Sequence, residues 1–322
     1  MQQWLTMTGA LIPAFGIILV GVVARRINWL TEEADRTLLN LCVRLLFPCF
    51  ILIQMNRSEW PTGASGLLIP PLVGFGLTAM GFAVCWMIVR PFGKQLGLPT
   101  SVHRRTFVLC AGMFNYGYLP IPLVQQLFPK GSPVLPTLLL HNVGVEVAMW
   151  TLGILILAGK LTKRWWAGIL NPVVLTIMAA ITLKLTGAWQ LFDANARPVV
   201  SLIDSIGQCA IPLSLLLSGA TISDVWREAS FKEGWGVLGS STLIRLGVLP
   251  AMFLGVAMIF PFSAPLENVI AIQAAMPAAV FPILLAKHYG GDTPTAVRVV
   301  LITHFICLIT APAWLAFGLP GN

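Results

Sequence analysis

Residues 115–122 read NYGYLPIP and lie inside an apolar segment, 106–128, that is long enough to cross a membrane. A proline in mid-helix lacks the backbone donor and clashes with the carbonyl four residues earlier. Inside a bilayer the freed polar groups have no water to bond, so such a break must pack against protein or line a wet cavity. The run therefore predicts a broken membrane helix with a partner elsewhere in the chain.

The composition places the whole chain in a membrane. Of its 322 residues, 57% are hydrophobic and only 10% are charged. About 20 apolar residues span a hydrocarbon core, and short loops join ten segments of this kind. We predict an all-α polytopic membrane protein with spans near 7–25, 37–55, 66–89, 106–128, 134–158, 166–186, 198–220, 235–258, 265–287 and 296–318.

The distribution of Lys and Arg predicts the topology. With the N-terminus outside, the loops placed inside carry 14 of these residues and the loops outside carry four. This fits the positive-inside rule and accounts for the net charge of +8 without a nucleic-acid partner. Arg25 and Arg26 follow the first span, the reverse of a signal peptide's charge order, so we expect that span in the mature protein. We predict a multi-pass protein of the plasma (inner) membrane with both termini outside.

The prolines of the two halves of the chain align. Three pairs are separated by close to half the chain length: Pro48 and Pro212, Pro120 and Pro282, and Pro13 and Pro172. Five spans is an odd number, so a second copy must enter the membrane with the opposite orientation, a plan typical of secondary transporters. We predict two inverted five-helix repeats, 1–160 and 161–322.

The fourth and ninth spans occupy equivalent places in the two halves and are the most interrupted. The N-terminus of a half-helix carries a partial positive charge, so two broken helices that meet at the midplane would form a site for an anion. The alternative is that the prolines only kink these spans for packing. We predict the substrate-binding residues Asn115, Gly117 and Pro120 in span 4, and Pro277 and Pro282 in span 9.

Ionisable residues inside the spans are the other candidates, because a charge at mid-bilayer is costly and must face protein or a cavity. Arg245 is the candidate countercharge of an anionic substrate, since a guanidinium holds a carboxylate bidentately. Glu146 is the candidate proton carrier, and the alternative is a structural salt bridge between these two residues. Arg44 and Asp204 lie near the prolines of spans 2 and 7, and we interpret both as structural.

His304, in span 10, is a second coupling candidate because an imidazole titrates near neutral pH. The alternative is an interhelical hydrogen bond. The six cysteines all fall within predicted spans, and no Cys or His spacing resembles a metal-ligand pattern. We therefore expect no metal and no cofactor.

Three stretches resemble the auxin efflux carrier family, which includes the plant PIN auxin exporters and bacterial carriers of malate and malonate. They are FNYGYLPIPLVQQLF at 114–128, AIPLSLLLSGATISD at 210–224 and MPAAVFPILLAKHYGGD at 276–292. The resemblance implies two five-helix repeats, spans 4 and 9 crossing at the binding site, elevator-like movement and, in some members, a homodimer. Asn115 matches a family Asn near the substrate carboxylate, while Pro120 and Pro282 match the crossing prolines. The long cytoplasmic loop of the plant exporters has no counterpart here, so the plant substrate is not carried over.

These observations favour a secondary carrier of an organic anion, of the carboxylate class by the resemblance, driven by protons or by the membrane potential. No nucleotide-binding loop is present. One rival is a sodium-coupled carrier of the bile-acid symporter type, for which Asn115 and Gln273 are among few oxygen ligands; another is a channel or receptor. An intramembrane enzyme would need paired catalytic groups, and neither Asp204 with Glu146 nor a Ser with His304 has a known catalytic spacing. We expect no enzymatic activity.

Overall fold

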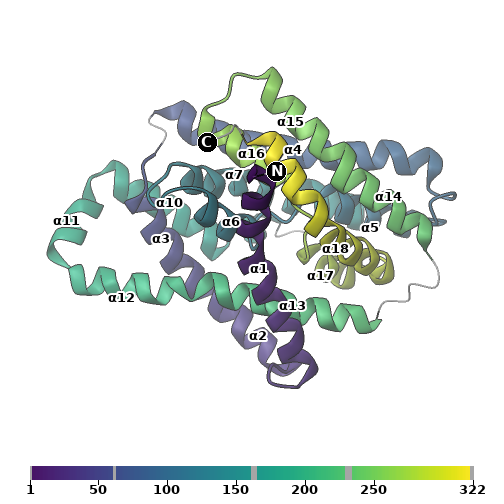
Figure 1. The fold of residues 1–322 in the computed structure, drawn as a ribbon, viewed down its shortest axis with the longest axis horizontal. Helices are drawn as coiled ribbons and strands as arrows, with labels where there is room; N and C mark the ends of the chain where they lie inside the picture. Colours follow the sequence, from purple (N-terminus) through teal and green to yellow (C-terminus); the bar gives the residue numbers. More distant parts are fainter. Residues whose placement is uncertain (1, 61–62, 161–164, 229–233, 320–322) are drawn as a thin grey trace.

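The computed structural model describes residues 2–60, 63–160, 165–228 and 234–319. Throughout these ranges the chain is helical, apart from turns, short extended segments and a single isolated β-bridge. Figure 1 shows the helices packed into one body, with α12 and α13 following one another across its lower part and α2 projecting below them.

The described part of the first half comprises eight α-helices and two π-helical segments. Its elements are α1 (Gln2–Arg26), α2 (Glu32–Leu41), η1 (Cys42–Leu46), α3 (Phe47–Arg57), α4 (Ala64–Phe92), α5 (Ser101–Gly112), α6 (Pro120–Leu127), α7 (Val134–Ala148), η2 (Met149–Gly153) and α8 (Ile154–Ala158).

The second half continues with α9 (Trp165–Ile169), α10 (Pro172–Leu185), α11 (Ala188–Asn195), α12 (Arg197–Gln208), α13 (Ala210–Glu228), α14 (Trp235–Leu243), η3 (Ile244–Val248), α15 (Leu249–Ile259), α16 (Ala264–Ala275), α17 (Phe281–Tyr289) and α18 (Thr293–Gly318). Two of the π-helical segments end just before a proline, η1 before Pro48 and η3 before Pro250. A proline cannot donate the regular helical bond, and the wider turn accommodates the loss without ending the helix.

Several helices are long and apolar enough to cross a membrane. Within the described ranges there are seven continuous ones, Thr6–Arg26, Glu32–Arg57, Ala64–Phe92, Val134–Ala158, Arg197–Trp226, Trp235–Ile259 and Thr293–Gly318. An eighth is the pair α10 and α11, bent by 89°. The predicted fourth and ninth spans are instead the interrupted pairs α5/α6 and α16/α17. The multi-pass helical class is confirmed, whereas ten spans in two inverted repeats stay a prediction.

Glycines allow the closest helix contacts. A Cβ added to Gly144 of α7 would lie 1.7 Å from the Pro71 carbonyl oxygen of α4, and one added to Gly219 of α13 would lie 2.0 Å from the Ile18 carbonyl oxygen of α1. Small residues are typical of such contacts between membrane helices. The pairs α4/α7 and α1/α13 are accordingly the most extensively packed in the protein.

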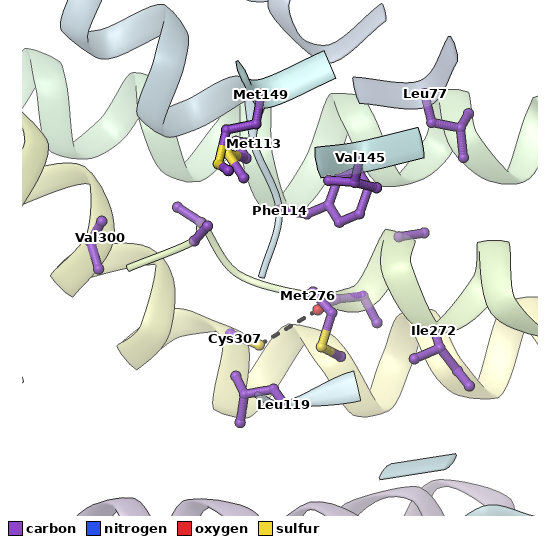
Figure 2. Close-up of a cluster of buried hydrophobic side chains, with 14 of the residues drawn as sticks. Leu77, Met113, Phe114, Leu119, Val145, Met149, Ile272, Met276, Val300 and Cys307 are labelled. Carbon is purple, nitrogen blue, oxygen red and sulfur yellow. Dashed lines mark hydrogen bonds between the residues drawn. The ribbon is translucent and has the colours of Figure 1, made fainter. Parts of the chain in front are cut away.

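The best-buried part of the core surrounds the interrupted helices. Figure 2 shows hydrophobic side chains that come from several elements and converge around Met113, Phe114 and Met276. The Cys307 thiol of α18 donates a hydrogen bond to the Ala275 carbonyl oxygen at 3.5 Å, where α16 ends. The ends of the broken helices are thus held inside packed protein, where the lipid cannot reach them.

Candidate functional site

Two non-helical segments, 113–119 and 276–280, interrupt the paired helices, and we call them the crossing. The backbone leaves the helical region at Met113 and again at Met276, which precedes Pro277. A residue before proline is pushed toward extended conformations. Helices α6 and α17 then begin with Pro120 and Pro282 in their first turns, where the fixed φ of proline suits a helix start.

The crossing satisfies its own backbone. The Asn115 N–H donates to the Pro277 carbonyl oxygen at 2.8 Å, and the Ala279 N–H donates to the Met113 carbonyl oxygen at 3.0 Å. These two bonds form an antiparallel bridge between Phe114 and Ala278. The Ala278 N–H donates to the Thr303 hydroxyl of α18 at 3.2 Å. This pairing is how non-helical backbone is tolerated at membrane depth.

A cavity of about 690 Å³ opens at the crossing, and we call it the crossing cavity. The starts of both broken helices line it, with Gly117, Tyr118 and Ile121 from the α6 side and Val280 and Phe281 from the α17 side. The remaining wall comes from α2, η1, α3, α7, η2, α9 and α10, together with Asn171 just before α10. Two helix N-termini therefore converge on one cavity, which is favourable for a negative charge.

Polar side chains line the crossing cavity at a few places. Asn115 is only 5% exposed, and its side chain has no hydrogen-bond partner among the described residues. Asn142 and Asn171 contribute two further amides. Arg44 and Glu146 are the cation and the carboxylate among the described lining residues. The cavity can therefore bind an anion through an amide, a guanidinium and two helix ends.

Glu146 is held by two neutral donors. The Tyr116 hydroxyl donates to one carboxylate oxygen at 2.7 Å, and the Trp150 indole N–H donates to the other at 2.9 Å. Both donors also line the crossing cavity. The carboxyl group is thus fixed in place beside the space that a ligand would occupy, without a cation against it.

Arg245 lies elsewhere. It is fully buried in η3, with its guanidinium carbon 5.6 Å from the centre of the Phe114 ring and 5.3 Å from that of Phe253. None of its three nitrogens has a hydrogen-bond partner among the described residues. The alternative of a salt bridge with Glu146 is absent from the described residues, because the Arg245 nitrogens contact no partner and the Glu146 oxygens accept from Tyr116 and Trp150. Arg245 is also absent from the lining of the crossing cavity.

The other predicted residues fall into different places. Pro120, Pro277 and Pro282 shape the crossing but are not among the residues that line the cavity.

His304 lies outside the crossing cavity and lines a second one between α1, α13 and α18, with its Nδ1 2.8 Å from the Val300 carbonyl oxygen. Asp204 forms an ion pair with Arg57, in keeping with a structural role. Within the described residues no three His, Cys, Asp or Glu gather as metal ligands.

Sequence reasoning missed two residues, Arg44 and Tyr116. Arg44 had been interpreted as structural, yet it lines the crossing cavity. Tyr116 stands inside the opening motif and orients Glu146. Asn142 donates to the Tyr116 carbonyl oxygen at 2.7 Å and accepts from the Gln273 side chain at 3.0 Å. The signal available for Arg44 was its position four residues before Pro48, close to a break in the regular helix.

Comparison with known proteins places the chain among transporters. A family model described as "Membrane transport protein" (Mem_trans) matches residues 6–164 and 160–315. Curated relatives named "Uncharacterized transporter YfdV", from Escherichia coli strain K12, Escherichia coli O157:H7 and Shigella flexneri, are each 20% identical over 326 residues. The matches cover 95% of this chain and 96% of each relative.

Proposed function

From the premise that this chain belongs to the Mem_trans family of membrane transport proteins, we propose that it is a secondary active carrier of organic anions of the carboxylate class. The observation that carries the proposal is the convergence of the α6 and α17 N-termini on the crossing cavity. Each helix end contributes partial positive charge from the aligned peptide dipoles. Pro120, Pro122 and Pro282 carry no N–H, so this charge, more than direct N–H bonds from the first turns, would attract the anion. A low-dielectric site strengthens their attraction for an anion.

The cavity side chains support a carboxylate in particular. The Asn115 amide lies next to the crossing and can donate a hydrogen bond to a carboxylate oxygen. Arg44 can form a bidentate pair with the same kind of group. Most other lining residues are apolar, including Phe47, Ile51 and Val174. The carrier would therefore accept a carboxylate with a modest organic body.

Coupling to protons would use Glu146. Its carboxyl group lines the cavity, so a bound anion and this group would repel each other while the group is ionised. Protonation removes that repulsion and would favour loading of the anion. Movement of the crossing as an elevator-like unit, a location in the plasma membrane with both termini outside, and a homodimer complete the proposal.

A sodium-coupled carrier is the second candidate, and one observation favours it. The Gln273 Oε1 is buried and has no donor among the described residues, while its Nε2 contacts the Asn142 side chain. An unpartnered buried carbonyl oxygen is a suitable ligand for a hard cation. The surrounding oxygens are few, so we rank this candidate below the proton-coupled carrier.

The test is uptake by purified protein in proteoliposomes. A panel of mono- and dicarboxylates is offered under an inward proton gradient, and saturable uptake of at least one is expected. Asn115→Ala should lose most of the uptake, whereas Asn195→Ala, an exposed amide on α11, should not. Normal rate and affinity in Asn115→Ala would overturn the proposed site. Stimulation by a sodium jump without a proton gradient would favour the second candidate, and large unitary currents would indicate a channel.

A further inference from the structure

A second cavity, of about 650 Å³, runs between α1, α13 and α18, and we call it the α1 groove. These three helices pack against one another. Along α1 the lining follows one helical face, through Leu11, Phe15, Leu19, Val22 and Arg26. From Thr8 to Arg26 the groove covers 18 residue steps of α1, or about 27 Å at 1.5 Å per residue. That length is close to the roughly 30 Å thickness of a hydrocarbon core.

The walls of the α1 groove are apolar and open to the surroundings. Ile12, Leu19, Phe305 and Leu308 line it and are all exposed. The groove therefore meets the acyl region of the bilayer, where the surrounding molecules are lipid chains. A long and apolar groove of this kind fits a hydrocarbon chain better than a polar solute.

Polar side chains lie at one end of the α1 groove. Arg26 is exposed and has no ion-pair partner among the described residues, in contrast to its neighbour Arg25, which is buried and pairs with Asp35 and Asp224. Ser223 lines the groove from α13; it is only 2% exposed, and its hydroxyl has no hydrogen-bond partner among the described residues. The contact between Arg25 and Asp224 places Ser223 near this end of α1.

We propose that the α1 groove is a binding site for an anionic phospholipid. One acyl chain lies along α1, the phosphate pairs with Arg26, and the Ser223 hydroxyl donates to an oxygen of the glycerol-phosphate region. The charge pattern of the loops predicts that Arg26 faces the inside, where basic residues between membrane helices attract acidic headgroups. The charge complementarity at one end and the apolar length of the rest select a lipid over a second copy of the chain.

A lipid bound in the α1 groove would affect the packing around the crossing. The groove lies where α18 packs against the α1/α13 pair, and α18 supplies the Thr303 hydroxyl that accepts the Ala278 N–H of the crossing. A lipid wedged there would set how α18 lies against α1. Binding itself, however, is measured without any transport, so this inference and the proposed function can fail separately.

The test uses a phosphatidylglycerol that carries a photoactivatable group in its acyl chain. The full-length protein is reconstituted in phosphatidylcholine vesicles that contain this lipid, irradiated and mapped by mass spectrometry. We expect label on α1, α13 and α18 along the groove, with competition by unlabelled phosphatidylglycerol at least several-fold stronger than by phosphatidylcholine. Equal labelling of the exposed apolar residues of α4 would overturn the proposal.

Matched variants separate the acyl contact from the charge contact. Gly16 lines the groove and Gly9 does not, and an added Cβ has open space at both. Gly16→Leu should fill the groove and abolish the specific label, whereas Gly9→Leu should leave it unchanged. Leucine is a better helix former than glycine, so neither change should weaken α1.

The charge is tested in the same way. Arg26→Gln should keep acyl labelling but lose the preference for phosphatidylglycerol, and the exposed Arg36→Gln is its control. Size-exclusion profiles show that each variant is folded. If Arg26→Gln and Gly16→Leu both label like the unmodified protein, the site is wrong. If Gly16→Leu instead disrupts a dimer of a protein that takes up no label, a second copy covers the groove and the proposal is also overturned.

Discussion

The guanidinium carbon of Arg245 lies 5.6 Å from the centre of the Phe114 ring, and Phe114 is the residue that pairs with Ala278 at the crossing. A fully buried cation is therefore stacked on the junction of the two broken helices. The cation–π contact offsets part of the free energy lost when the charge is removed from water. An unpaired buried charge nevertheless remains destabilising. The cation adds positive potential at the crossing although it does not line the crossing cavity.

Arg245→Met should stabilise the fold and weaken the binding of anions. Methionine fills a similar volume without a charge to desolvate, so the free energy of unfolding should rise by about 1–4 kcal/mol. The apparent KM for a transported carboxylate should rise several-fold as positive potential is lost. Thermal unfolding and uptake are measured together, with Arg245→Lys as the control that keeps the charge. A less stable Arg245→Met protein with unchanged KM would contradict this role.

Arg44→Gln should weaken anion uptake in a salt-dependent manner. Arg44 lines the crossing cavity but is exposed, so water and salt screen its attraction for a carboxylate. We expect KM to rise about two- to fivefold at low ionic strength, as for an exposed ion pair worth up to about 1 kcal/mol. The difference should shrink in high salt. Arg90→Gln, an exposed cation at the end of α4, should change neither value.

Glu146→Gln should separate exchange from proton-driven uptake. The amide keeps an oxygen that can accept from Tyr116 or Trp150 but cannot release a proton. Counterflow of substrate should continue, while accumulation under an inward proton gradient should be lost. Glu59→Gln removes an exposed carboxylate and serves as the control. Unchanged proton-driven accumulation in Glu146→Gln would assign the coupling to another group.

Gly144→Ala should destabilise the protein strongly. The new Cβ would lie 1.7 Å from the Pro71 carbonyl oxygen, so α4 and α7 must separate. We expect the free energy of unfolding to fall by at least about 1–3 kcal/mol, as for an overpacked core. Gly76→Ala on α4, where an added Cβ meets open space, should be neutral or slightly stabilising. Thermal scanning of the detergent-solubilised variants compares the two, and equal stability would contradict the close contact.

The prolines predicted the breaks well because their effect is local. Pro120 and Pro282 disfavour the interior of a helix and suit its first turn, and each lies in the first turn of a new helix. A proline alone does not decide the break, because Pro13 and Pro312 lie inside the continuous helices α1 and α18. The convergence of the two breaks followed from the requirement that freed backbone groups find partners in lipid. The sequence predicted Asn115 and Gly117 at the binding site because they lie at one of these two breaks.

The partners of the buried charges were not predictable in this way. Span position gives the depth of Glu146 and Arg245 but not the direction in which each side chain points around its helix. That direction depends on packing among helices far apart in sequence, such as the stacking of Arg245 on Phe114 and Phe253. The position of Arg44 at the crossing cavity also depends on such packing, since helices from both halves of the chain line that cavity.

The bridge between Phe114 and Ala278 has a mechanical consequence. Its two hydrogen bonds lie in a dry interior, so swinging one broken helix away from the other would strand buried donors and acceptors. A conformational cycle that avoids this penalty must move both interrupted helices together as one rigid body. The electropositive helix ends and a bound anion would then keep the same mutual geometry throughout the cycle. Only the contacts between this rigid body and the surrounding helices would change.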